Sequence, residues 1–430
     1  MQAYSEYKVV ESRWFRELPI NWNSIRAKWI FSNEKERATG EDEQLAASQK
    51  YGVIPQSKMM ELNSAKVMLA LKGTENFKRI KQNDFVISLR SFEGGIEHSL
   101  YDGCISPAYT VLRSRRKDIV ENYFKYALKS KNFIDALNST SEGIRDGKTI
   151  TYEQFGELVL ALPEHNEQAA IAIFLDRETA RIDKLISEKQ NFIKLLKEKR
   201  QALISHVVTK GLDPNVKMKD SGIEWIGEVP EHWSVIKFTH FVSIRNGQVD
   251  PTMPPWDEYT LIAPNHIETM SGRIIKRETA KEQGADSGKY LCEKGEVIHS
   301  KIRPALAKAC LCEGDLTICS ADMYPMTCDS RMKNEYLLWL ILSNEFTRYA
   351  ILESDRVAMP KINRESLARI KFPVPQLEEQ LKGIEFIKSR VSGIEAVIEE
   401  TNSSIDLLKE HRTALISAAV TGKIDVREQV

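Results

Sequence analysis

Residues 195–205 read LLKEKRQALIS and residues 407–417 read LLKEHRTALIS, so nine of eleven positions are identical at an offset of 212 residues. The match continues at this offset in both directions without a gap, and 20 of the 51 positions from 163 to 213 are identical to those from 375 to 425. A similarity of this length within one chain indicates that a segment has been duplicated.

A second match lies far upstream of each copy. WFRELPINWNSI at 14–25 resembles WIGEVPEHWSVI at 225–236, at an offset of 211 residues, and NDFVIS at 83–88 parallels GEVIHS at 295–300. A period above 200 residues is typical of a duplicated domain, because solenoid repeats have units of about 20–50 residues. The chain therefore consists of two halves built on one plan.

Each half ends in a predicted long helix. Pro163 precedes the first one, acidic residues lie in its first turn and Gly211 follows it, which predicts a helix over 164–210. Such a helix is roughly 70 Å long at about 1.5 Å per residue, which is too long for the core of one globular domain. The expected apolar stripe, with a spacing near 3.5 residues, consists of Leu175, Ile182, Leu185, Ile186, Phe192, Ile193, Leu196, Leu203 and Val207. Because the copy has the same stripe, we expect the two helices to pair as a coiled coil.

The segments 14–160 and 225–372 have a different pattern. Short β-rich runs such as 66–71, 85–89 and 108–112 alternate with Gly, Asn and Asp turns, and one helix interrupts them at about 118–137 and 333–352. These segments are predicted to be mixed α/β globules. The expected fold class is α+β, with two globules in a pseudo-twofold arrangement, separated by an antiparallel coiled coil of two long helices.

Length and composition restrict the class of protein. A chain of 430 residues with 42% apolar and 28% charged residues suggests a globular protein of at least two domains. No apolar run approaches the roughly 18 residues of a membrane helix, and the N-terminus lacks the apolar region of a secretion signal, so we expect a cytoplasmic protein. The 61 basic and 61 acidic residues argue against a nonspecific polyanion binder, but not against one that reads a specific DNA sequence.

The order globule, helix, globule, helix suggests a function. If the helices pair antiparallel, a twofold-like axis relates the globules, and the strands of B-DNA are related by an axis of the same kind. Two globules so arranged can read two separated half-sites, and because their sequences differ, the half-sites differ. The expected target is therefore two-part and asymmetric.

Both halves resemble the specificity (S) subunit of type I restriction–modification systems. The resemblance rests on the repeated WFRELPINW and WIGEVPEHW motifs, on P-x-x-x-E-Q at each helix start (163–168 and 375–380) and on ALIS-x-x-VT at each helix end (202–209 and 414–421). It implies target-recognition domains at 1–162 and 214–374, and conserved spacer helices at 163–213 and 375–430.

The resemblance also implies the partners and their cofactors. An S subunit binds double-stranded DNA and assembles with two methyltransferase (M) and two restriction/translocase (R) subunits. It is not itself catalytic. The complex it resembles is a site-specific deoxyribonuclease and adenine-specific DNA methyltransferase, whose partner subunits use S-adenosylmethionine, ATP and Mg²⁺. We expect no cofactor in this chain.

Two other classes of protein are kept as alternatives. One is a self-contained DNA methyltransferase or nuclease with a divergent site, and the other is a coiled-coil scaffold that binds proteins. Ser106-Pro107-Ala108-Tyr109 is similar to the adenine-holding motif of amino-methyltransferases but lacks its second proline, so we interpret it as a turn before a strand. The segment 143–149 has one residue too few for a P-loop. The cysteines from 310 to 328 lack paired C-x2-C spacing, so we expect a strand with one buried face there and no metal site.

Candidate DNA contacts are basic and amide side chains in loops beside the predicted strands, because Arg and Lys pair with guanine and Asn and Gln pair with adenine, while either kind can hold phosphate. The candidates are Lys72, Arg79, Arg90, Ser91 and Lys148 in the first half, and Arg245, Asn246, Gln248, Lys301, Arg303 and Arg356 in the second. The repeated helix charges at Lys197, Glu198 and Arg200 and at Lys409, Glu410 and Arg412 are predicted to offer a partner one docking surface twice.

Overall fold

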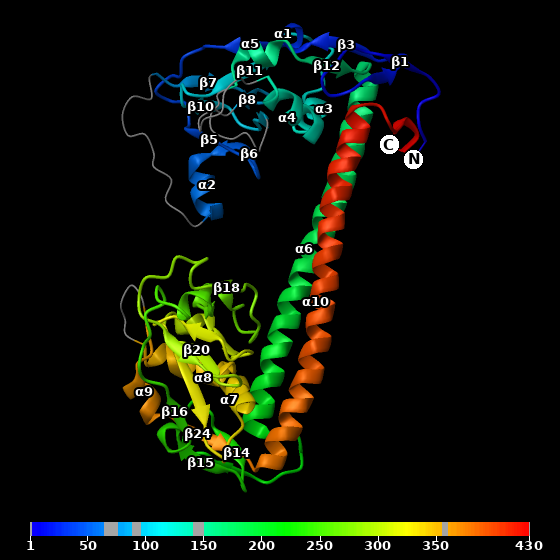
Figure 1. Ribbon diagram of the computed structural model, residues 1–430. Helices are drawn as coiled ribbons and strands as arrows, with labels where there is room; N and C mark the ends of the chain where they lie inside the picture. The colour runs from blue at the N-terminus through cyan, green and yellow to red at the C-terminus, as the bar shows by residue number, and fades with distance from the viewer. Residues whose placement is uncertain (1, 64–75, 88–95, 141–149, 355–359, 430) are drawn as a thin grey trace. The chain divides into compact units, whose positions relative to one another are not determined.

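The computed structural model describes residues 2–63, 76–87, 96–140, 150–354 and 360–429 (Figure 1). They form two compact units. The first unit contains Met1–Glu188 and Ser403–Val430, and the second unit contains Lys189–Asn402. Two long helices, α6 (His165–Lys210) and α10 (Leu377–Val420), each contribute one part to either unit.

The first unit is built around an antiparallel sheet with strand order β4-β11-β8-β9. A second strand pair, β3–β12, and the hairpin β1–β2 lie beside it in the fold, and β5–β6 and β7–β10 form two further pairs. The strands are β1 (Tyr7–Val9), β2 (Glu17–Pro19), β3 (Asn23–Arg26), β4 (Phe31–Glu34), β5 (Leu45–Ser48), β6 (Gly52–Pro55), β7 (Lys78–Ile80), β8 (Phe85–Ile87), β9 (Ile96–His98), β10 (Gly103–Ile105), β11 (Thr110–Ser114) and β12 (Val159–Leu162). The short helices are α1 (Ala27–Ile30), α2 (Gln56–Asn63), α3 (Glu121–Ala127), α4 (Lys131–Asn138) and α5 (Tyr152–Gly156).

The second unit repeats this plan. Its central antiparallel sheet has the order β16-β23-β20-β21, β15 pairs with β24, and β13 pairs with β14. It also has a sheet of order β18-β17-β22-β19. The strands are β13 (Met218–Asp220), β14 (Glu228–Pro230), β15 (Ser234–Lys237), β16 (Val242–Ile244), β17 (Thr260–Ile262), β18 (Glu278–Thr279), β19 (Tyr290–Cys292), β20 (Val297–Ser300), β21 (Ala309–Leu311), β22 (Thr317–Cys319), β23 (Met323–Cys328) and β24 (Lys371–Val374). The helices are α7 (Asn334–Ile341), α8 (Asn344–Leu352) and α9 (Arg364–Arg369), with 3-10 turns η2 (Phe238–His240), η3 (Trp256–Glu258), η4 (Pro264–His266), η5 (Pro304–Leu306) and η6 (Arg427–Gln429), the last of which belongs to the first unit.

The predicted fold class is confirmed in its elements, with one difference in each half. The single helices expected at 118–137 and 333–352 are each two helices, α3 with α4 and α7 with α8. A serine lies at both breaks. Ser130 Oγ donates to the Ala127 carbonyl at 2.8 Å, and Ser343 Oγ donates to the Leu340 carbonyl at 2.7 Å and accepts from the Phe346 amide. A serine side chain that bonds to the backbone in this way favours a helix start over a helix interior.

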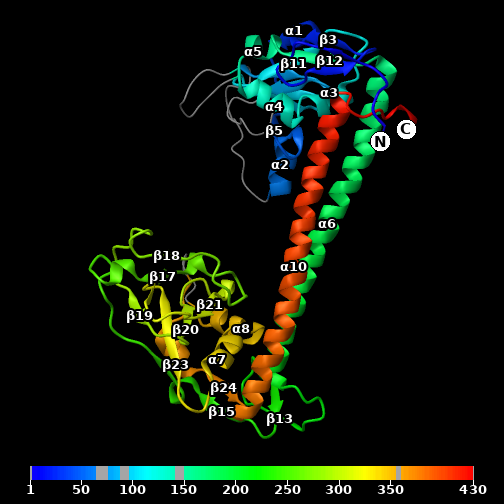
Figure 2. The same cartoon turned by 45° about the vertical axis from the view of Figure 1, so that its right-hand side comes forward.

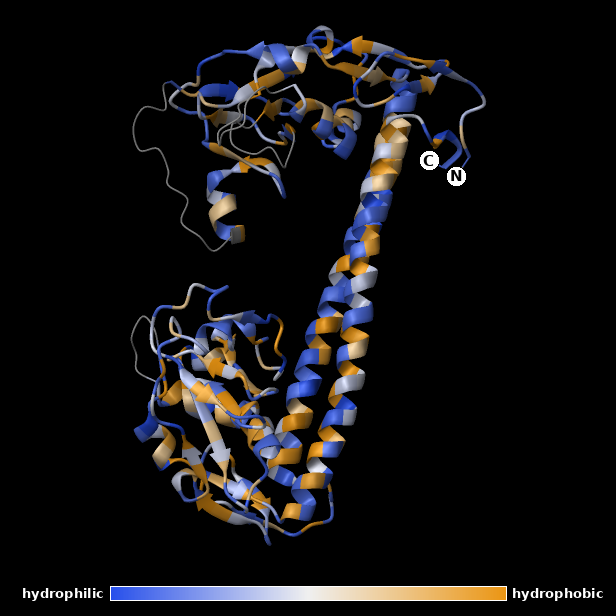
Figure 3. Ribbon diagram, in the orientation of Figure 1, coloured by the Kyte–Doolittle hydropathy of each residue, from blue (hydrophilic) through white to orange (hydrophobic). Residues whose placement is uncertain are grey.

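The parts of α6 and α10 that belong to one unit pack antiparallel and complete its core. In the first unit, Ile171 and Ile182 of α6 and Leu415 and Val420 of α10 belong to one buried cluster with the strands. In the second unit, Ile204 and Ile387 do the same. Figure 2 gives a second view of the two helices, and Figure 3 shows apolar and polar residues following one another along both.

The predicted apolar stripe of α6 is right in part. Leu175, Ile182 and Ile193 are buried, but Leu185 is 37% exposed and Phe192 is 46% exposed. A single partner helix covers only a narrow seam of about two positions per heptad, so the outer members of a wider stripe stay in solvent.

A buried glutamine fixes the start of each long helix to its own unit. Gln168 and Gln380 are 212 residues apart, and each side chain is at most 1% exposed. Each amide oxygen accepts from a backbone N–H, and each amide nitrogen donates to two backbone carbonyls. The partners are Val120, Asp118 and Pro163 for Gln168, and Lys333, Arg331 and Pro375 for Gln380. The two halves therefore repeat an entire hydrogen-bond network, and the P-x-x-x-E-Q motif encodes it.

The end of each long helix packs against the opening hairpin of a globule. Gly211 (φ +79°) follows α6, and a Cβ atom there would lie 3.2 Å from Trp233 Cζ2. Gly422 (φ +69°) follows α10, and a Cβ atom there would lie 2.4 Å from Pro19 Cδ and 3.4 Å from the ring of Trp22. Both the left-handed backbone and the close approach require glycine.

One ion pair across the helices also occurs twice. In the second unit, Arg200 of α6 binds Glu395 of α10 and donates to the Met270 carbonyl at 3.1 Å. In the first unit, Arg412 of α10 binds Asp183 of α6 at 2.9 Å. The two pairs use equivalent positions of the repeat, because Arg412 corresponds to Arg200 and Asp183 corresponds to Glu395. The arginine lies on α6 in one pair and on α10 in the other. The prediction that Arg200 lies on an outward docking surface is wrong, because its side chain is 3% exposed, and Arg412 is used across the helix pair as well.

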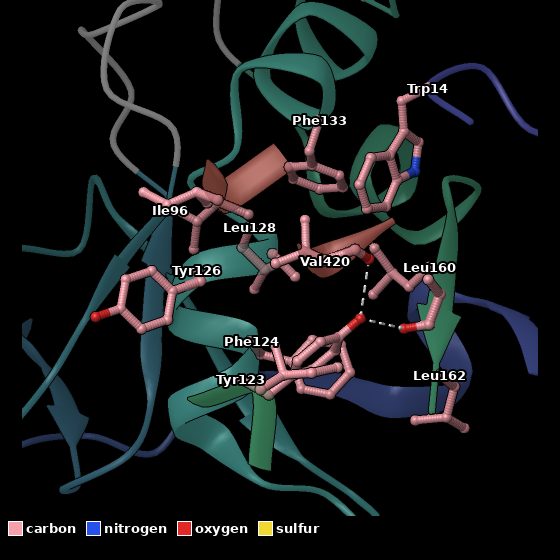
Figure 4. Packing of buried hydrophobic residues seen from close by; sticks show 14 of the residues in the cluster. Trp14, Ile96, Tyr123, Phe124, Tyr126, Leu128, Phe133, Leu160, Leu162 and Val420 are labelled. Atoms are coloured by element: carbon pink, nitrogen blue, oxygen red, sulfur yellow. Dashed lines mark hydrogen bonds between the residues drawn. The ribbon is translucent and has the colours of Figure 1, made fainter. Parts of the chain in front are cut away.

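The core of the first unit contains a hydroxyl that the repeat does not match. Tyr123 donates to the Val420 carbonyl at 3.2 Å and lies 3.3 Å from the Ala161 carbonyl (Figure 4). Its repeat equivalent, Tyr336, is 1% exposed, and within the described residues its hydroxyl has no hydrogen-bond partner.

No helix among the described residues is long and apolar enough to cross a membrane.

We predict opposite results for the same substitution in the two units. Tyr123→Phe loses a buried hydrogen bond and should lower the stability of the first unit by about 1 kcal/mol. Tyr336→Phe removes an unsatisfied hydroxyl and should leave the second unit unchanged or slightly more stable. Hydrogen exchange of the full chain, read by mass spectrometry for peptides of each unit, measures both effects. An equal loss of protection in the two variants would contradict the assignment.

Candidate nucleic-acid interface

In the second unit, two distant segments converge beyond the end of β20. Ile302 forms an isolated bridge with Lys361, the Arg303 amide donates to the Pro360 carbonyl at 2.8 Å, and the Ile362 amide donates to the Lys301 carbonyl at 2.8 Å. These backbone contacts bring two segments that carry four cationic residues next to each other. We call Lys301, Arg303, Lys361 and Arg364 the basic cluster.

Two members of the basic cluster are held over an aromatic ring. Lys301 Nζ lies 5.7 Å and Arg364 Cζ lies 5.3 Å from the ring centroid of Tyr324 on β23, within the range of cation–π attraction. Lys301 also donates to the Ala321 carbonyl at 2.6 Å and lies 3.9 Å from Asp322. Burial raises the pKa of Tyr324, so the ring stays neutral.

Arg364 organises the loop after β16. Its guanidinium donates to the Ile244 carbonyl at 3.3 Å, to the Arg245 carbonyl at 2.8 Å and to Asn246 Oδ1 at 2.6 Å. The predicted contact Asn246 is exposed, and its side-chain oxygen is oriented by Arg364, which is not among the predicted contacts.

The predicted contact Arg245 has protein partners. It lies 2.7 Å from Glu296 and 2.8 Å from Glu293, and the hydrogen bond to Glu296 raises its pKa. Because Glu296 is buried and also accepts from Thr327, Arg245 compensates an interior carboxylate. Gln248 is exposed, and its side chain lies against Gly288, where a Cβ atom would lie 2.6 Å from Gln248 Oε1.

In the first unit, Arg79 is the one predicted contact within the described residues. It lies 3.1 Å from Glu36 and 3.6 Å from Asp42, with its side chain 40% exposed. The predicted contacts Lys72, Arg90, Ser91 and Lys148, and Arg356 of the second unit, lie outside the described residues, as do the expected strand at 66–71 and the segment 143–149.

Sequence reasoning missed Lys361 and Arg364. Both lie in PKINRES at 360–366, a short basic run that could have been noticed. What the sequence did not show is that this run pairs with the loop after β20, some 60 residues earlier, because that contact is tertiary.

The other chemical motifs lie in ordinary structural surroundings. Ser106 accepts from the Tyr109 amide at 3.1 Å in a turn before β11, which confirms the interpretation as a turn. Cys310 and Cys312 are both buried, and burial raises the pKa of each thiol, to about 11 for Cys312. Within the described residues, no cluster of His, Cys, Asp and Glu could hold a metal ion.

A buried histidine lies near the end of the strand that leads to the basic cluster. His299 is on β20, two residues before Lys301, and its ring centroid lies 5.6 Å from that of Phe346. Burial lowers the pKa of His299 to about 4, so the imidazole is neutral in the folded protein at neutral pH.

Comparison with known proteins agrees with the resemblance inferred from the repeat. Residues 230–405 match the family model of the type I restriction modification DNA specificity domain. The chain is 27% identical to the type I restriction enzyme EcoDI specificity subunit of Escherichia coli over 296 residues, which covers 65% of this chain and 66% of that subunit, just under two thirds of its length. It is 23% identical to the MjaVIII specificity subunit of Methanocaldococcus jannaschii, over 99% of this chain and 98% of that one.

Solved structures show the same fold. A chain from a study of complex assembly and conformational transition of the type I R-M system has a TM-score of 0.69 at 14% identity, covering 95% of this chain and 99% of that chain. The HsdS subunit from Thermoanaerobacter tengcongensis has a TM-score of 0.51 at 14% identity, covering 95% of this chain and 98% of that chain. The solved structures share the fold, and the family-model match and the specificity-subunit relatives confirm the resemblance to type I specificity subunits.

We predict that acid weakens the second unit through His299. Its folded pKa lies below the unfolded value near 6.5, so the unfolded chain binds the proton first. The stabilising effect of the neutral ring is therefore complete above pH 6.5 and is lost as the pH falls toward 4, by about 2 kcal/mol at pH 5. Urea unfolding of the full chain at pH 7 and at pH 5, monitored by hydrogen exchange in peptides of the second unit, measures the loss of stability. His299→Leu should abolish most of the difference, whereas His206→Gln, at an exposed position of α6, should preserve it; equal behaviour of the two variants would refute the role of His299.

Proposed function

We propose that this chain is the DNA specificity subunit of a type I restriction–modification complex and that it selects an asymmetric, two-part DNA site for its partner subunits. The observation that carries the proposal is the duplicated plan. The two units share the order of the central sheet, the glutamine network at the helix start and the glycine contact at the helix end, while their loops differ. The specificity-domain match and the specificity-subunit relatives support the same function.

The differences between the units support unequal half-sites. The second unit has the four-stranded sheet β18-β17-β22-β19, whereas the corresponding described part of the first unit has the pairs β5–β6 and β7–β10. In a protein that recognises a DNA sequence, loops and edge strands are where sequence differences change the recognised site, because side chains that project into a groove contact the base edges. We propose recognition segments 1–162 and 214–374 and spacer segments 163–213 and 375–430.

The proposed DNA contacts follow from the available donors. Among the described candidates, Arg303, Gln248 and Asn246 of the second unit are exposed outside the strands, and Lys301 belongs to the basic cluster. Arg79 of the first unit lies on strand β7, where its side chain is 40% exposed beside Glu36. The guanidinium of Arg245 is already bound to two carboxylates, so we propose that it supports the loop after β16.

We propose that catalysis resides in the partners. Methylation with S-adenosylmethionine and ATP- and Mg²⁺-dependent cleavage would belong to two methyltransferase and two restriction subunits. The complex would act on cellular DNA, which places it in the cytoplasm.

Exposed apolar residues at equivalent positions support binding of two copies of one partner. Leu195 is 61% exposed and its equivalent Leu407 is 65% exposed, while Leu185 is 37% and its equivalent Val397 is 39% exposed. Each unit therefore carries one residue from each pair. Apolar side chains kept in water at both copies indicate a surface that a partner covers.

Co-expression with a partner adenine methyltransferase, followed by methylation-aware sequencing, tests the proposed function. The expected result is methylation confined to a motif of two different specified parts with a gap of unspecified bases. A single contiguous palindrome, or no methylation in the presence of a folded complex, would refute the proposal.

Exchange of one recognition segment should change one part of the motif. Replacing residues 14–160 with the corresponding segment of another such subunit should alter one half-site and leave the other half-site and the methylation level unchanged. The incoming segment must keep Trp22 and Tyr123, because they contact Gly422 and Val420. A change in both half-sites would contradict independent reading by the two units.

Lengthening a helix should change only the gap. Insertion of one helical turn within 163–210, matched by an insertion in α10, should lengthen the unspecified gap without altering either half-site, because the helices contribute spacing rather than base contacts. The same sequencing assay measures the gap. An altered half-site with an unchanged gap would exclude a spacer role for this helix pair.

A further inference from the structure

The turn that follows Lys301 has an unusual backbone. Arg303 (φ +48°, ψ +61°) and Ala307 (φ +40°, ψ +54°) are both left-handed, and they flank the single 3-10 turn Pro304–Leu306. Left-handed backbone is unfavourable for residues with a side chain, and glycine would relieve the strain. Residues held in this way persist only where their surroundings determine the conformation, and such positions cluster at functional sites.

The surroundings of this turn do determine its conformation. Its two ends are joined where the Ser300 amide donates to the Lys308 carbonyl at 2.9 Å, and inside it the Leu306 amide donates to the Arg303 carbonyl at 2.9 Å. The Met270 amide reaches the Leu306 carbonyl at 3.3 Å from a different loop. Together with the contact of Arg303 to Pro360, these bonds hold the turn from three sides.

The four cations of the basic cluster are not equivalent. Lys301 and Arg364 use their donors on the Ala321 carbonyl and on the loop after β16. The side chains of Arg303 and Lys361 are exposed, and within the described ranges neither makes a hydrogen bond or an ion pair. The turn therefore presents one arginine whose side-chain donors have no partner among the described residues.

On the premise of the proposed function, we propose that Arg303 is the base-reading residue of this turn and that it recognises one guanine in the half-site of the second unit. A guanidinium has paired N–H donors that match O6 and N7 of guanine in the major groove, and no other base offers this pair of acceptors. A rigid backbone suits this task, because a bidentate contact requires the direction of the side chain to be fixed. Lys361 has a point charge instead, which suits a phosphate and contributes affinity without selectivity.

The test compares Arg303→Ala and Arg303→Gly with Lys361→Ala in the full chain, co-expressed with the partner methyltransferase. Arg303→Gly keeps the left-handed backbone accessible, so a loss of selectivity in this variant does not come from a misfolded turn. Both Arg303 variants should relax the methylated motif at one guanine of one half-site, with a loss of discrimination of about 5- to 150-fold at that base pair. Lys361→Ala should lower methylation uniformly and leave the motif unchanged.

Binding to modified DNA provides a second measurement. Replacing the relevant guanine with 7-deazaguanine removes the N7 acceptor. The wild-type complex should then bind more weakly, whereas the Arg303→Ala complex should bind the modified and the unmodified DNA equally. An unchanged motif in both Arg303 variants, or a uniform weakening like that of Lys361→Ala, would overturn the role of Arg303 and leave the proposed function standing. Absence of a two-part motif for the wild-type chain would overturn the proposed function itself.

Discussion

The physical constraint on which this structure depends is that neither unit can complete its core from one repeat of the sequence alone. The first unit needs Leu415 and Val420 from the end of α10, and the second unit needs Ile204 and Val207 from the end of α6. Apolar burial is the dominant favourable contribution to folding, so we expect each globule to depend for its stability on the helix of the other repeat. Each unit is thereby built from both repeats of the sequence.

Around this constraint, the repeated polar contacts fix register. Gln168 and Gln380 each satisfy three backbone groups that would otherwise be buried without partners, and such groups are costly. The pair Arg200–Glu395 and its equivalent Arg412–Asp183 join the helices at corresponding places. A buried ion pair such as Arg200–Glu395 adds little net stability, but removing one partner costs about 3–5 kcal/mol, so this pair penalises any other alignment of the helices in the second unit. The side chains of Arg412 and Asp183 are 36% and 54% exposed, so their pair contributes less.

Much of this could be predicted from sequence, and the limits have physical causes. The 212-residue offset identified the duplication, both long helices and the motif that carries Gln168, because local patterns determine them. The prediction that Arg200 points outward is wrong. A charged side chain beside an apolar seam can point to solvent or across to the partner helix, and only the packing of the two helices determines which. For the candidate site, Lys301 and Arg303 were selected from their place after a strand, but Lys361 and Arg364 come from a segment that only the tertiary fold brings near. The divergent loops that would read DNA have no repeat to guide prediction.

The division of the chain into two units also affects the order in which they fold during synthesis. The second unit is one uninterrupted segment, Lys189–Asn402, whereas the first unit is built from both ends of the chain, and the Asp425 amide bonds the Gln2 carbonyl within it. Domains fold as units during translation, usually from the N-terminus onward. Here the order is reversed: the globule translated first must wait for the final residues, with part of its apolar core uncovered, while the globule translated second can close before it.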